Sequence, residues 1–200
     1  MKYFAILLAA GFVAGCATNT PQAESGFFAD YSKLGPNPKK AGSRIFTKPG
    51  IDLRVYDRLM IDPVDVRFSK NSDAGELDAE TKQKIADAFR RIMTETIDPY
   101  YSVVGDPDRT VLRIRLAVTD VSTAKPGDKG DDWSSVGTAS MEAELLDSMT
   151  GEILGQVVDK IKGSEKGGKA PSEWQHVEGA FVEWSESLLD YMDRQNERKD

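Results

Sequence analysis

Few residues of this 200-residue chain could carry covalent chemistry, because it contains one cysteine, Cys16, and one histidine, His176. Nucleophilic catalysis by a Ser/His/Asp or Cys/His arrangement needs an imidazole beside the nucleophile. His176 lies off the apolar stripe of its segment, which indicates an exposed helical position. A zinc site needs three or four ligands from Cys, His and carboxylates. The sequence therefore predicts no metal site, no protein-bound cofactor and no catalytic residue.

Carboxylates remain, and they gather in the segment KPGDKGDDWSSVG, residues 125–137. We interpret this segment as a solvated connection between two strands. Alternatively, Asp131, Asp132 and Trp133 could form a small-ligand or sugar-binding edge in which the indole stacks on a sugar ring. The acidic spacing does not match a 12-residue EF-hand loop. A glycosidase would need two carboxylates about 5–10 Å apart across a cleft.

Cys16 ends the one strongly apolar run of the chain. Lys2 supplies a positive start, and the apolar residues 3–13 have the length of a secretory signal but not the roughly 20 residues of a spanning helix. The sequence VAGC at residues 13–16 resembles the bacterial lipobox, whose cysteine sulfur accepts diacylglycerol. We therefore expect a lipoprotein signal peptide at residues 1–15. The mature chain would begin at Cys16 and be held on a membrane by covalent diacylglycerol and an N-acyl lipid.

The charge of the mature chain is acidic. Removing residues 1–15 takes away Lys2 alone, so about 25 basic residues oppose 33 acidic ones and the formal charge is about −8. Such a surface repels nucleic acid, so we expect no nucleic-acid partner. With 30% charged and 40% hydrophobic residues, the chain has the composition of one ordinary globular domain.

The segment after Cys16 divides into a tether and an aromatic stretch. Residues 16–25 carry the lipid and have no periodicity, as in a flexible tether. Within residues 26–50, the aromatic residues Phe27, Phe28 and Tyr31 precede a Pro/Gly/Lys-rich connection. We interpret this region as an extended strap laid over the domain; the alternative is an aromatic patch that contacts a partner or ligand.

Residues 51–195 have the patterns of an α/β globular domain, and residues 196–200 those of a polar tail. Alternation is clearest at residues 110–121, where Leu112 and Ile114 fall on one face and Arg113 and Arg115 on the other, so one face of the sheet should be wet. The first expected elements are a strand over 56–68 with a bulge or edge at Pro63, and a helix that is capped by Asp73 or Asp78 and ends at Asp98. A short strand over 100–104 and longer strands over 110–121 and 138–146 should follow. A hairpin turn at Thr150 and Gly151 then leads to a further strand, and the last expected element is a helix that begins with Ser172 and Gln175.

This order predicts an α+β fold: a two-layer sandwich in which two helices pack on one face of a mostly antiparallel sheet of four or five strands. The last helix should bury a stripe that comprises Trp174, Val177, Phe181, Trp184, Leu188 and Tyr191.

Four segments behind the lipobox resemble a bacterial lipoprotein family known only as domain of unknown function 3313. They are GFFADYSKL, YDRLMIDPV, LRIRLAVTDV and MEAELLDSMTGEILGQVVD, and together they extend over nearly all of the mature chain. The resemblance implies a cell-envelope protein and brings no activity and no catalytic residues. Ala17 and Thr18 follow the cysteine where inner-membrane lipoproteins of enteric bacteria carry a retention aspartate, which favours the outer membrane.

Three functions follow as hypotheses. The first is a non-enzymatic lipoprotein anchored in the outer membrane on its periplasmic side, which binds or scaffolds an envelope protein. The second is a small-ligand or glycan-binding module that uses residues 125–137. The third is a hydrolase with paired carboxylates, which would need a concave pocket that holds both.

Overall fold

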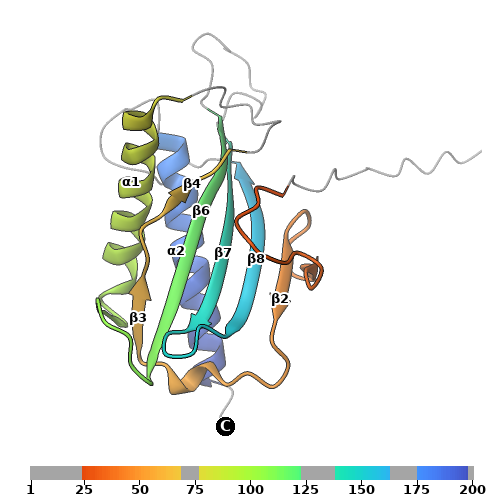
Figure 1. Cartoon of the computed structure of the whole chain (residues 1–200), viewed down its shortest axis with the longest axis vertical. Helices are drawn as coiled ribbons and strands as arrows, with labels where there is room; N and C mark the ends of the chain where they lie inside the picture. Colours follow the sequence, from red (N-terminus) through yellow and green to blue (C-terminus); the bar gives the residue numbers. More distant parts are fainter. Residues whose placement is uncertain (1–23, 69–76, 123–137, 163–174, 198–200) are drawn as a thin grey trace, which may run out of the picture.

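The computed structural model describes residues 24–68, 77–122, 138–162 and 175–197, which contain a mixed eight-stranded sheet and two long helices (Figure 1). Seven strands follow the spatial order β1-β2-β8-β7-β6-β3-β5, and β4 pairs with β6 beside this path. In chain order the elements are β1 (Gly35–Pro36), β2 (Arg44–Thr47), the 3-10 turn η1 (Leu53–Val55), β3 (Arg58–Ile61), β4 (Asp65–Val66), α1 (Ala79–Ile97), β5 (Ser102–Val103), β6 (Val111–Ser122), β7 (Thr138–Asp147), β8 (Ile153–Lys162) and α2 (Gln175–Glu197).

Helix α1 begins and ends where local chemistry predicts. The Asp78 carboxylate accepts a hydrogen bond from the Thr81 N–H at 2.7 Å, which satisfies one of the free donors of the first turn. Asp98 is the C-cap residue, and Pro99 after it cannot continue the helix. Of the two caps expected, Asp78 is therefore the one used, while Asp73 lies outside the described residues.

The strands β6, β7 and β8 form an antiparallel meander at the centre of the sheet. The β7–β8 turn needs Gly151, whose φ of +71° lies in the left-handed region that favours glycine. On β6, Leu112, Ile114 and Leu116 belong to the core that packs against the helices. The alternation expected for this strand is confirmed, and so is the Thr150–Gly151 hairpin.

Both helices pack on one face of the sheet, as expected (Figure 1). The Phe89 ring of α1 stacks on the Phe181 ring of α2 with centroids 4.4 Å apart, and both rings are fully buried. Val177 and Trp184 of α2 are buried in the same core. Trp174 and Ser172 of the expected stripe and cap lie outside the described residues.

The sheet is larger and more mixed than expected. The sequence predicts four or five mostly antiparallel strands, but β3 and β4 run parallel to β6. The reason is that α1 lies between them and the next strands, β5 and β6, and a helical crossover returns the chain in the same direction, so that β5 also runs parallel to β3. Pro63 interrupts the strand expected over 56–68, which becomes β3 and β4.

The Pro/Gly/Lys-rich connection also contributes strands. Within residues 26–50, β1 pairs with β2 and β2 pairs with β8. These residues therefore extend the sheet rather than only connecting the strap to it. At the other end of the chain, α2 continues to Glu197, so the expected polar tail begins later than residue 196.

Candidate functional site

Residues 24–34, called the strap below, lie across the face of the sheet opposite the helices. The strap is attached to Glu142 of β7, a residue with 0% exposure. The Tyr31 hydroxyl donates to Glu142 Oε2 at 2.6 Å. The Ser25 hydroxyl donates to the same oxygen at 2.9 Å, and the Ser25 N–H donates to Oε1 at 3.0 Å. One buried carboxylate therefore accepts three hydrogen bonds from the strap.

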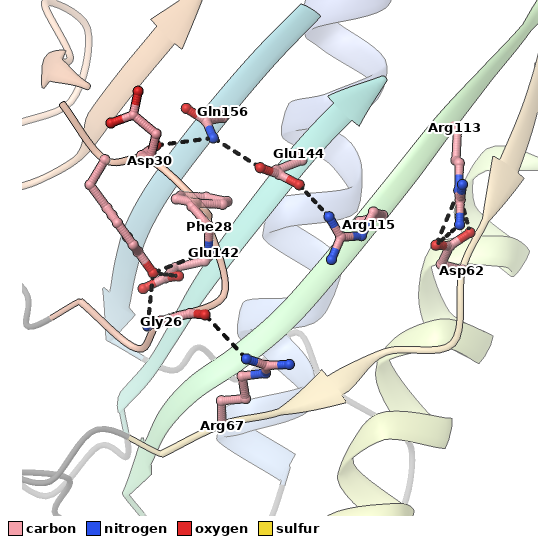
Figure 2. Close-up of polar contacts among 11 residues, drawn as sticks. Gly26, Phe28, Asp30, Asp62, Arg67, Arg113, Arg115, Glu142, Glu144 and Gln156 are labelled. Carbon is pink, nitrogen blue, oxygen red and sulfur yellow. Dashed lines mark hydrogen bonds and ion pairs between the residues drawn. The ribbon is translucent and has the colours of Figure 1, made fainter. Parts of the chain in front are cut away.

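A second buried carboxylate lies two residues along β7, on the same face of the sheet (Figure 2). Arg115 of β6 donates to Glu144 Oε2 at 2.7 Å, and the Gln156 amide of β8 donates to Glu144 Oε1 at 2.9 Å. These contacts join three adjacent strands because Arg115, Glu144 and Gln156 occupy the same register. Glu144 is 2% exposed, so this charge is buried together with its partners, as buried charges require.

The apolar side of the strap fills the space between these polar contacts. Phe27 and Phe28 are buried against Ala117 of β6 and Val158 of β8. The Arg115 guanidinium lies 4.9 Å from the centroid of the Phe27 ring, within range of a cation–π contact. The aromatic side chains of the strap are therefore part of a second, smaller core on this face of the sheet.

Two expectations for this face need correction. An exposed aromatic patch is wrong for Phe27 and Phe28, which are 8% and 4% exposed, because their rings cover the sheet. The second face of the sheet was expected to be wet, but the strap covers its centre and Ala117 is fully buried there.

The pKa of the Tyr31 hydroxyl is raised above its ordinary value by burial and by its hydrogen bond to Glu142. The hydroxyl also accepts hydrogen bonds from the N–H groups of Gly26 and Phe28, at 3.0 and 3.3 Å. A protonated Tyr31 therefore connects the carboxylate to the backbone of the strap across the physiological pH range.

An open hollow of about 340 Å³ lies beside the strap, lined by Phe27, Asp62, Pro63, Val64, Asp65, Arg115 and Leu116. It contains two carboxylates, and each is ion-paired. Arg113 binds Asp62 through two nitrogens, with contacts of 2.9 and 2.8 Å (Figure 2), and Arg67 binds Asp65 at 2.5 Å. The hollow thus holds arginine–carboxylate pairs rather than two carboxylates that face each other across a cleft.

A further buried carboxylate lies on the helix face. Asp159 of β8 is 4% exposed. It accepts a hydrogen bond from the indole N–H of Trp184 at 2.7 Å and an ion pair from Lys40 at 2.5 Å, both at Oδ2. Because these partners belong to α2 and to the β1–β2 connection, Asp159 joins three parts of the fold.

Several site residues expected from the sequence lie outside the described residues. They are Cys16, Asp131, Asp132 and Trp133. His176 belongs to α2, but its side chain is not described. In the described ranges, no group of three or more His, Cys, Asp or Glu side chains is arranged to hold a metal ion. Neither of the two described helices has the length and apolar character needed to cross a bilayer.

Sequence reasoning missed the polar residues of β7. In β7 the side chains of Ala139, Met141 and Ala143 belong to the core on the helix face, and strand alternation therefore places Glu142 and Glu144 together on the opposite face. The sequence does place two glutamates at neighbouring positions on one face of a strand in the middle of the sheet. If another segment covers that face, both carboxylates need hydrogen-bond donors, so this pair could have indicated a buried polar network.

Among curated proteins, none matches the chain in sequence. Similar solved structures include the PelC dodecamer from Paraburkholderia phytofirmans, which is 12% identical, covers 75% of this chain and 95% of that chain, and has a TM-score of 0.46. Protein XCC0632 from Xanthomonas campestris is 12% identical over 76% of this chain and 94% of that chain, with a TM-score of 0.44. Lipoprotein GNA1162 from Neisseria meningitidis is 14% identical over 68% and 98%, with a TM-score of 0.35.

The family resemblance found in the sequence is confirmed by a family model. The model matches residues 23–188, which include every described strand and most of α2. The chain belongs to the family described as protein of unknown function (DUF3313).

Proposed function

We propose that the chain is a lipid-anchored protein of the bacterial cell envelope, with diacylglycerol and an N-acyl lipid on Cys16. The observation that carries the proposal is the sequence VAGC at residues 13–16, at the end of a short apolar run and around the only cysteine of the chain. Lipid chains that bury many CH₂ groups, at about 0.8 kcal/mol each, hold an otherwise water-soluble domain on a membrane.

The geometry of the strap supports this proposal. Only eight residue steps separate Cys16 from Glu24, the first residue that the structure describes. At about 3.5 Å per residue, these steps extend at most about 28 Å. Ser25 is bonded to the buried Glu142, so the lipid would connect directly to the central strands of the sheet. The domain would therefore stay close to the membrane surface.

We place the anchor in the outer membrane, on its periplasmic side. This placement rests on Ala17 and Thr18, which stand where an inner-membrane lipoprotein of an enteric bacterium would carry aspartate. A matched variant tests the placement: Ala17→Asp should move the protein to the inner-membrane fraction in an enteric host. An unchanged distribution in both membrane fractions would refute the sorting proposal while leaving the anchor intact.

For the role of the domain we propose non-enzymatic binding or scaffolding of an envelope protein. Glu142 is covered by the strap and hydrogen-bonded to it, and the buried Glu144 is hydrogen-bonded to Arg115 and Gln156. Asp62 and Asp65 in the hollow are paired with arginines. This arrangement favours a structural network over a paired-carboxylate hydrolase. Crosslinking in intact cells followed by mass spectrometry should repeatedly recover the same envelope protein, and repeated failure to recover one would count against the proposal.

The glycan-binding alternative remains a proposal that rests on Trp133, Asp131 and Asp132. Trp133→Ala should abolish retention on a peptidoglycan column if the indole stacks on a sugar ring. Equal retention of both forms would refute the alternative.

The anchor itself is tested by labelling cells with palmitate. The natural chain should incorporate the label and sediment with membranes, whereas Cys16→Ala should do neither. Label that persists in the variant would show that another residue carries the lipid.

A further inference from the structure

We propose that the strap is a latch. In the closed state the strap is hydrogen-bonded to Glu142 of the sheet through Ser25 and Tyr31. In the open state residues 24–34 leave the sheet while the main core stays folded, and the link between anchor and domain becomes longer. This inference rests on the proposed lipid anchor at Cys16, because the link matters only if the chain is attached there.

The first support is that the strap has a hydrophobic cluster of its own. Phe27 and Phe28 pack with Ala117 and Val158, and the partly buried Tyr31 and Leu34 complete this cluster. The main core forms on the other face of the sheet, and no strap residue belongs to it. Removing the strap therefore leaves the helix–sheet packing unchanged. Elements with separate and smaller clusters open at lower free energy than the whole fold.

The second support is that the side chains of Ser25 and Tyr31 both bind one carboxylate, while the other polar contacts from the sheet side are the longer ones of Arg67 to the Gly26 carbonyl, Gln156 to the Asp30 carbonyl and Arg44 to Glu24, at 3.1, 3.5 and 3.6 Å. Glu142 receives all three hydrogen bonds from Ser25 and Tyr31, and Tyr31 in turn receives those of Gly26 and Phe28. Such a compact set of bonds opens together.

Opening exposes to water the charges that the strap covers. When the strap leaves, the Glu142 carboxylate becomes accessible to water, which replaces the lost donors. Arg44 loses its ion pair with Glu24, a contact of 3.6 Å in which the Glu24 side chain is 53% exposed, so this contact adds little to the closed state. Arg67 donates to the Gly26 carbonyl at 3.1 Å (Figure 2), and it keeps its ion pair with Asp65 when the strap moves away. Glu144 likewise keeps Arg115 and Gln156.

The consequence is a change in reach. With the latch closed, the eight steps from Cys16 to Glu24 extend at most about 28 Å. With the latch open, the link runs to Gly35 of β1, and its 19 steps extend at most about 66 Å. The latch would therefore decide whether the domain stays at the membrane or reaches a partner farther away.

The experiment compares Tyr31→Phe with the natural chain, both purified from membranes in detergent with their lipid. The variant keeps the ring and removes the hydroxyl that connects Glu142 to Gly26 and Phe28. Hydrogen–deuterium exchange read by mass spectrometry should show amides of residues 24–34 exchanging about tenfold faster. The amides of residues 111–121 should be unchanged. Ser25→Ala should act in the same direction.

Tyr56→Phe is the matched control, since its hydroxyl donates to Asp147 away from the strap. It should leave exchange of residues 24–34 unchanged. In the natural chain, the amides of residues 24–34 could exchange as slowly as those of residues 111–121, and Tyr31→Phe could change both groups of amides by the same factor. The strap would then unfold only together with the sheet, and the latch would be refuted.

Reach is measured in vesicles. A fluorophore on Met149→Cys, at an exposed position, transfers energy to an acceptor dye in the lipid. Adding Tyr31→Phe should lower the transfer efficiency, and unchanged transfer despite faster strap exchange would overturn the change in reach. The mass of the amino-terminal peptide shows separately whether Cys16 carries lipid. A peptide without lipid would overturn both the anchor and the proposed change in reach. The hydrogen–deuterium exchange of residues 24–34 would still show whether the strap opens.

Discussion

Replacing Trp184 by phenylalanine should destabilise the domain by breaking a buried bond to a carboxylate. The indole N–H donates to Asp159 Oδ2 at 2.7 Å, and both residues are almost fully buried. Asp159 Oδ1 has no hydrogen-bond partner in the described part of the chain, so the remaining contacts matter more. Lys40 pairs with Oδ2 from a side chain that is 42% exposed, where solvent weakens the attraction.

The expected loss combines two terms. A hydrogen bond to a charged group contributes about 1.5–3 kcal/mol, and the smaller ring adds roughly 1 kcal/mol of lost packing. For a chain of this size each kcal/mol lowers Tm by about 2–4 °C, so Trp184→Phe should lower Tm by about 5–16 °C. Thermal unfolding followed by circular dichroism at 222 nm measures this change.

A double-mutant cycle separates the bond from the packing. In an Asp159→Ala background the indole N–H has no carboxylate partner, so Trp184→Phe should cost only about 1 kcal/mol there. The coupling between the two positions should therefore exceed about 1 kcal/mol. A coupling below about 0.5 kcal/mol would show that the hydrogen bond between Trp184 and Asp159 does not stabilise the fold as expected.

Three further predictions follow from the fold. Phe89→Ala should lower the free energy of unfolding, measured in urea, by about 3–5 kcal/mol, because the ring is fully buried. A loss near 1 kcal/mol would instead mean that neighbouring side chains fill the cavity. Asp78→Ala should lower the free energy of unfolding by removing the cap of α1. Because the Thr81 N–H lowers the pKa of Asp78, this contribution is present above pH about 4 and lost as pH falls below it, and equal stability of both forms at pH 7 would contradict the cap. Burial and the hydrogen bond to Asp147 raise the pKa of Tyr56 from about 10 to about 12, so the contribution of this hydroxyl to stability is complete below pH 10 and lost between pH 10 and 12. Over that interval the stability of Tyr56→Phe should decline less steeply than that of the natural chain. Parallel declines would contradict the raised pKa of Tyr56.

The elements with strong local patterns could be predicted from the sequence. The alternation of Leu112, Ile114 and Leu116 fixes the face of β6, and Asp78 and Asp98 bound α1, because these signals act within a few residues. The meander of β6, β7 and β8 follows from the turn at Gly151. Local chemistry thus determines the centre of the sheet and the position of both helices on one face.

The remainder depends on contacts between distant residues. β1 and β2 occur in a Pro/Gly-rich segment whose composition indicates a connection, and only pairing with β8 makes them strands. The parallel pairing of β3 follows from the crossover through α1, a property of topology rather than of any one segment.

The candidate site shows the same dependence most clearly. Glu142 meets Ser25 across 117 residues of chain, and no periodicity of either segment encodes that contact. The strap itself could be predicted from its aromatic residues, but the carboxylate that holds it could not.

Lipidation of Cys16 as the first residue of the mature protein is decided by mass spectrometry of the amino-terminal peptide, taken from protein extracted from cell membranes. The peptide should begin at Cys16 and carry the added mass of diacylglycerol and one further acyl chain. A peptide that begins elsewhere, or a Cys16 without lipid, would contradict it.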